Sequence, residues 1–193
     1  MANPDAPYGF YPVRHVNGDP YNGPTDVYQV AASYGTALYI GQPVIVTGEA
    51  SSTGIPVVSA VTIGASNPAT AVIMGFEALP TSLETKHWPA STATARKVYC
   101  VNVRDYIFKI REDSVGGALT AASTGLNASW VGTTGNNTTG VSKIYLDSNT
   151  ANTTNTLQLR ILRLAPEIGN EIGNYAQWWV KFLYPQDDAL LGI

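Results

Sequence analysis

Few residues of this chain could carry acid–base, nucleophilic or metal chemistry, and they are scattered along it. His15 stands among prolines and His87 beside a tryptophan, and nothing in the sequence pairs either with a nucleophile. Cys100, the only cysteine, lies inside an alternating run, which is typical of a buried, unreactive thiol. The spacings of phosphate-binding glycine loops, HExxH zinc sites and EF-hands are all unmet. We therefore expect no catalytic site, no metal and no cofactor, and a protein that is not an enzyme.

Two acidic pairs, Glu112-Asp113 and Asp187-Asp188, are the remaining candidates for chemistry. Neighbouring side chains in a strand point to opposite faces of the sheet, so neither pair forms a glycosidase-like carboxylate pair by itself. Asp113 shortly precedes two glycines, where a carboxylate that caps a turn is the ordinary role. A calcium site built from loop oxygens is the alternative there.

The elements that must position these residues are short strands. Alternating or continuous apolar runs predict strands over residues 26–30, 37–49 (two strands, or one bent at Gly41), 59–63, 70–79, 98–103, 106–111, 126–131, 141–146, 157–161 and 175–183. A short helix is predicted around 118–123, and the helices that a parallel sheet would need are missing. The predicted fold class is all-β: a jelly-roll-like antiparallel sandwich or barrel with an extended N-terminal arm.

Alternation also predicts the core of this fold. One face of the strand over 106–111 is apolar, and Lys109 and Arg111 lie on the opposite face. Trp178 and Trp179 should place one ring in the core and the other at an interface or under a loop, with sugar stacking as a minor alternative. We expect burial of Tyr106, Phe108, Ile110, Leu157, Leu159, Ile161 and Val180.

The predicted arm, residues 1–24, combines five prolines with four aromatic rings. Proline fixes φ and removes a hydrogen-bond donor, which disfavours both a helix and a central strand. Exposed rings on such a segment need a surface that covers them. We predict that this surface belongs to a partner, with an arm folded onto its own core as the alternative. The residues assigned to the partner interface are Tyr8, Phe10, Tyr11, Arg14 and Tyr21.

Within this interface we expect Tyr8, Phe10 and Tyr11 to lie mostly on another chain, and Arg14 to pair with an acidic group of the partner. Residues 25–186 then form the β domain, and 187–193 a C-terminal tail. If this division is right, deleting residues 2–14 leaves the β domain folded.

Composition and charge limit the classes of function. Charged residues make up only 13% of the 193, about half the usual share, which disfavours a long charged helix or coiled coil. The net charge of −3 excludes a strongly basic nucleic-acid binder as the main interpretation. Arg14 is the only Lys or Arg before Lys86, so the first half of the chain is expected to be more buried or packed on a partner. We expect no signal peptide and no transmembrane helix.

Several segments are informative when they are taken together and in order. They are ANPDAPYGFYPVRH; ALYIGQPVIVTG with SAVTIGAS and AVIMGFEA; VNVRDYIFKIRED; DSNTANTTNTLQLRILRLA; and NYAQWWVKFLY. Together they span nearly the whole chain, which resembles the capsid cement, or decoration, proteins of tailed bacteriophages. None of these segments is a catalytic signature.

The resemblance implies a structural virion protein that binds the outer surface of the capsid and stabilises the shell of the major capsid protein. It implies self-association as a dimer or trimer at symmetry axes and assembly in the host cytoplasm. It also implies no catalysis, and we expect no direct contact with nucleic acid or membrane. The alternative function is a carbohydrate- or receptor-binding β-sandwich module on the virion surface, which would show an exposed aromatic cluster beside acidic loop residues.

Overall fold

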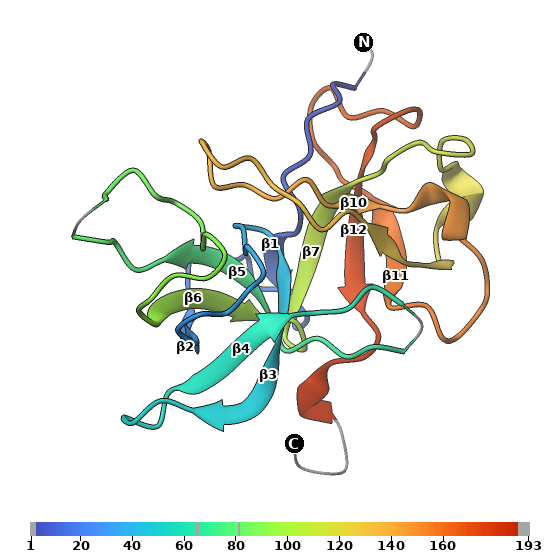
Figure 1. Ribbon diagram of the computed structural model, residues 1–193. Helices are drawn as coiled ribbons and strands as arrows, with labels where there is room; N and C mark the ends of the chain where they lie inside the picture. The colour runs from blue at the N-terminus through green and yellow to red at the C-terminus, as the bar shows by residue number, and fades with distance from the viewer. Residues whose placement is uncertain (1–2, 65, 81, 189–193) are drawn as a thin grey trace.

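The computed structural model describes residues 3–64, 66–80 and 82–188, and these residues form an all-β structure (Figure 1). Short 3-10 helices lie at Ala121–Ser123, Ser148–Thr150 and Gln186–Asp188. The strands are β1 (Tyr11–His15), β2 (Asp26–Val30), β3 (Pro43–Ala50), β4 (Pro56–Ala60), β5 (Ala71–Phe76), β6 (Arg96–Asn102), β7 (Tyr106–Arg111), β8 (Asn127–Ala128), β9 (Trp130–Val131), β10 (Tyr145–Leu146), β11 (Leu159–Leu164) and β12 (Gln177–Phe182). Within the described ranges, no helix is long and apolar enough to cross a membrane.

One half of the molecule is a five-stranded antiparallel sheet with the strand order β1-β7-β12-β11-β8. Its inner face carries aromatic and branched side chains from alternate positions, among them Phe108, Val180 and Phe182. These side chains pack into the larger of two hydrophobic cores, which also takes in Trp130 and Trp178. Because side chains alternate between the two faces of a strand, the intervening side chains of these strands lie on the outer face of the sheet.

The other half is a closed barrel with the strand order β2-β4-β3-β5-β6. Every neighbouring pair is antiparallel except β2 and β4, which are parallel. Closure removes the exposed strand edges that an open sheet would leave. Figure 1 shows the barrel on one side of the molecule and β7, β12 and β11 on the other, with β1 between them.

The barrel has its own smaller core, which includes Trp88, Ile73 and Cys100. Cys100 is fully buried, as its alternating context predicts. Burial in this apolar surrounding raises the pKa of the Cys100 thiol, because the thiolate loses its hydration. The thiol therefore stays protonated and acts as a small packing residue.

Most predicted strands are present, with shifted ends. The strands predicted over 26–30 and 106–111 match β2 and β7, whereas the run over 37–49 becomes a strand only from Pro43. Gly41 precedes that strand with a φ of +83°, a conformation that turns the chain and suits glycine. Of the predicted core residues, Phe108, Ile110, Leu159, Ile161 and Val180 are buried, but Tyr106 and Leu157 are only partly covered.

The N-terminal segment is not a separate arm. Residues 11–15 form β1, which pairs with β7 at the edge of the five-stranded sheet. An edge strand tolerates proline because one side of it needs no ladder hydrogen bonds, and a bulge follows Pro12. Phe10 is 1% exposed and lies in the chain's own core, so the prediction that it lies on another chain is wrong. Of the predicted tail, residues 189–193 lie outside the described residues.

Candidate functional site

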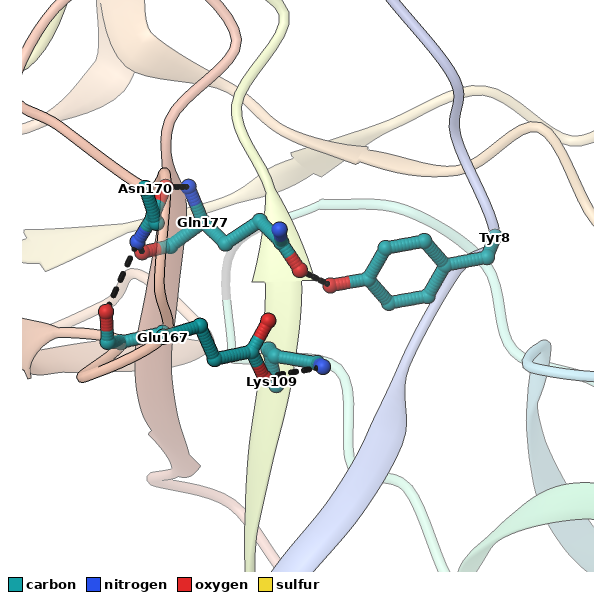
Figure 2. Close-up of polar contacts among 6 residues, drawn as sticks. Tyr8, Lys109, Glu167, Asn170 and Gln177 are labelled. Carbon is teal, nitrogen blue, oxygen red and sulfur yellow. Dashed lines mark hydrogen bonds and ion pairs between the residues drawn. The ribbon is translucent and has the colours of Figure 1, made fainter. Parts of the chain in front are cut away.

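The N-terminal segment is fixed to the five-stranded sheet by polar contacts. The Tyr8 hydroxyl donates a hydrogen bond of 2.6 Å to Oε1 of Gln177 on β12 (Figure 2). The Arg111 guanidinium on β7 donates to the carbonyl oxygens of Ala6, at 3.2 Å, and Tyr175, at 2.7 Å. Tyr8 is largely covered, and this burial raises the pKa of its hydroxyl. The segment therefore has a defined course across one end of the sheet.

Lys109 on β7 is the central charge of this region. Its Nζ forms an ion pair of 2.5 Å with Oε1 of Glu167 (Figure 2). It also lies 5.6 Å from the ring centre of Tyr8 and 5.5 Å from that of Tyr11, which is within cation–π range. Lys109 thus holds two tyrosine rings and the loop after β11 against one face of the sheet.

The loop that carries Glu167 is itself braced against β12. Asn170 accepts a hydrogen bond of 2.9 Å from the backbone N–H of Gln177 and donates to the carbonyl oxygens of Ala165 and Gln177. Figure 2 shows Asn170 and Gln177 next to each other, with Glu167 reaching toward Lys109. An asparagine amide can satisfy a backbone donor and backbone acceptors at once, which orders a loop that has no ladder of its own.

Beside these rings lies a hollow of about 390 Å³, here called the apolar pocket, which is lined by Tyr8, Phe10, Tyr11, Ile40, Met74, Lys109 and Val141. Its volume is within the range of pockets that take a small ligand or a few side chains of a partner. Lys109 is the only charged residue in the lining, and Glu167 already neutralises it. The pocket therefore suits an apolar or aromatic group and has no unpaired charge of its own to select an anion.

The outer face of the five-stranded sheet continues from this pocket. Lys109 stands opposite Trp179 in the register of β7 with β12. The Trp179 ring has the Arg14 guanidinium 5.2 Å from its centre and the Arg163 guanidinium at 5.4 Å. We call Arg14, Arg160, Arg163, Trp179 and Lys181 the cationic face.

The structure brings together four of the five residues that the sequence assigns to a partner interface. Tyr8, Phe10 and Tyr11 line the apolar pocket, and Arg14 belongs to the cationic face. Tyr11 is 49% exposed and Arg14 is partly exposed. Phe10 is in the core, and Tyr21 packs edge-on against Tyr106. The prediction that Arg14 pairs with a partner's acidic group stays a prediction, because no partner chain is present.

Sequence reasoning does not assign Arg163 and Gln177 to this site. The predicted strand over 157–161 ends before Arg163, and a bulge between Ile161 and Arg163 shifts the register there. That bulge sets Arg163 opposite Trp179. The one signal in the sequence was the expectation that one ring of the Trp178-Trp179 pair lies outside the core. This expectation is confirmed, because Trp178 is buried and Trp179 is partly exposed.

The residues considered for catalysis do not converge. His15 packs edge-on against Tyr106, whereas His87 stacks on Tyr39 at a centroid distance of 5.2 Å. Burial, with Arg96 nearby, lowers the pKa of His87, so it is neutral at pH 7. Among the described residues, no three or more His, Cys, Asp or Glu side chains are grouped so as to hold a metal ion. Comparison with known protein families, curated proteins and solved structures finds no match to this chain.

Proposed function

We propose that this chain is a structural virion protein of the capsid cement class, which binds the outer surface of a tailed-phage capsid and stabilises the shell of the major capsid protein. The observation that carries the proposal is the continuous surface formed by the apolar pocket and the cationic face. Tyrosine, tryptophan and arginine beside an apolar hollow are the residues that are enriched where proteins bind proteins. The sequence resemblance supplies the identity of the partner.

The proposal includes self-association as a dimer or trimer at the symmetry axes of the capsid and a position on the outer surface of the virion. It also retains the expectation of a jelly-roll-like arrangement within the all-β fold. A low share of charged residues suits such a role, since a surface of hydroxyl and amide groups costs less to desolvate than a charged one.

The alternative, a carbohydrate- or receptor-binding module, is supported only by the exposed ring of Tyr11, which contacts Lys109 beside the acidic loop residue Glu167. A sugar needs an open aromatic ring on which to stack. Trp179 is the partly exposed tryptophan among the four, and guanidinium groups from Arg14 and Arg163 already lie over it. This arrangement fits a protein interface better than a sugar platform.

Co-sedimentation with capsids tests the proposal. Purified chain, mixed with expanded capsids that lack it, should bind in a saturable way and raise the temperature at which the particles release their DNA. Tyr11→Ser, which changes the pocket, should weaken binding, whereas Leu83→Ser, at an exposed position away from the pocket, should not. A chain that stays in the supernatant at saturating concentration contradicts the proposal.

A further inference from the structure

The cationic residues of this acidic chain are concentrated on one sheet. The strands β1, β7, β11 and β12 together hold six of the eleven Lys and Arg residues and no Asp or Glu. The chain as a whole has a net charge of −3, so this distribution runs against its overall charge. A local excess of one sign produces a potential that attracts groups of the opposite sign.

Two of the six cations, both on β7, lie outside the cationic face. Lys109 is paired with Glu167, and Arg111 donates to backbone carbonyl oxygens under the N-terminal segment. The four that remain belong to the cationic face. Within it, Arg160 Nε donates to Asn127 Oδ1 at 2.5 Å, and Arg163 Nε donates to the carbonyl oxygen of Leu164 at 3.3 Å. None of the four has a carboxylate oxygen within 4.0 Å in the described part of the chain, where ion pairs form at Lys97, Arg104 and Lys109 instead.

The register of the sheet and the Trp179 ring place these charges in two pairs, Arg160 with Lys181 and Arg14 with Arg163. Arg160 stands directly opposite Lys181, and Arg163 stands opposite Trp179. Like charges on facing positions of neighbouring strands destabilise a sheet, so this arrangement costs stability in the free protein. The Nε atom of Arg14 is closed off from solvent and has no hydrogen-bond partner in the described structure. A ligand with several carboxylates would relieve the repulsion between Arg160 and Lys181.

Acidic residues border the face on two sides, which limits the kind of anion that fits. Glu167 lies at the Lys109 side, and Asp105 and Asp188 share a hollow with Lys181. Asp188 is paired with Arg104 at 3.0 Å. A long nucleic acid crossing the sheet would meet these carboxylates as well as the cations. A short segment with a few carboxylates can contact the cations alone.

We propose that the cationic face binds a carboxylate-rich segment of a partner protein, with the guanidinium groups of Arg14 and Arg163 held ready by Trp179. A planar guanidinium binds a carboxylate through two parallel N–H donors, and stacking on an aromatic ring fixes its plane in advance. The inference rests on the proposed function only for the identity of the partner, which would be the capsid subunit.

Tryptophan fluorescence can report binding at this face. Trp88, Trp130 and Trp178 are buried, so acrylamide quenching reports mainly on Trp179. A peptide of alternating Glu and Gly, added to the full chain at low salt, should bind and protect Trp179 from quenching, and the matching Gln–Gly peptide should not. The double variant R163Q/K181Q should bind the Glu peptide about tenfold more weakly, since two partly exposed ion pairs are worth about 1.4 kcal/mol together. Lys97→Gln, which removes a barrel cation, should bind normally.

In the peptide experiment, three outcomes overturn the inference: no protection by the Glu peptide, equal affinity of R163Q/K181Q and the wild type for it, or tighter binding of a DNA duplex than of the Glu peptide. Circular dichroism of R163Q/K181Q establishes that the variant is folded. The proposed function is judged separately by capsid binding. If the wild type and R163Q/K181Q bind capsids equally, the inference fails and the proposed function stands. If the Glu peptide binds but capsids do not, the proposed function fails and the inference stands.

Discussion

Replacing Phe10 with alanine should lower the free energy of unfolding by about 3–5 kcal/mol, as for other fully buried aromatic residues. The ring is 1% exposed and lies 4.9 Å from the ring centre of Phe182, with edge-on contacts to Phe108 and Trp130. Alanine would leave a cavity among three aromatic rings and would remove contacts between the N-terminal segment and the core. Denaturant unfolding, monitored by circular dichroism, measures the change.

Tyr11→Ala is the matched control, because Tyr11 is the next residue along the chain and is 49% exposed. Its cost should be about 1 kcal/mol or less, as expected for an exposed cation–π contact with Lys109. Deletion of residues 2–14 should unfold the protein, because it removes the core residue Phe10 and most of β1. A stable, folded deletion variant, or equal costs for the two alanine substitutions, would contradict the assignment of this segment to the core.

Glu112→Gln should stabilise the protein at alkaline pH, by up to about 3 kcal/mol at about pH 8. Glu112 is completely buried, and its Oε2 accepts a hydrogen bond of 2.8 Å from the backbone N–H of Leu119. Burial raises the pKa of this carboxyl to about 7, and the neighbouring Asp113 acts in the same direction. The folded protein therefore favours the neutral acid.

The pH dependence of stability follows from the raised pKa of Glu112 in the folded protein. The folded state holds a proton that the unfolded chain releases near the ordinary glutamate pKa of 4.5, so the wild type loses stability as the pH rises from about 4.5 to about 7. The loss is complete above that range. The difference in unfolding free energy between E112Q and the wild type should thus be small at about pH 4 and largest at about pH 8. Parallel stability profiles for the two proteins would show that Glu112 does not titrate in this range.

The sequence predicts the fold class and much of the core because both depend on local periodicity. Phe108, Ile110 and Val180 alternate with polar positions, and alternation alone assigns them to the inner face. The closed barrel could not be predicted in the same way. Its closure depends on pairing between distant strands, such as β2 with β6 and the single parallel contact of β2 with β4, and no local pattern encodes such partners.

Proline was the main source of error for the N-terminal segment. Five prolines argue against a central strand, and this holds, since β1 is an edge strand. They do not argue against an edge strand. Phe10, the residue directly before β1, can then enter the core. The aromatic residues indicated a surface that covers them, and for Phe10 that surface is the chain's own core. The cationic face could not be predicted from the sequence, because a bulge in β11 determines where Arg163 lies.

A cryo-electron microscopy reconstruction of capsids mixed with the purified chain tests the central claim most directly. The account predicts additional density on the outside of the shell, in which the apolar pocket and the cationic face point toward the capsid subunits and the barrel points away from them. Particles without such density, density on the inner surface, or a chain bound through the barrel with Tyr11 and Trp179 facing solvent would contradict it.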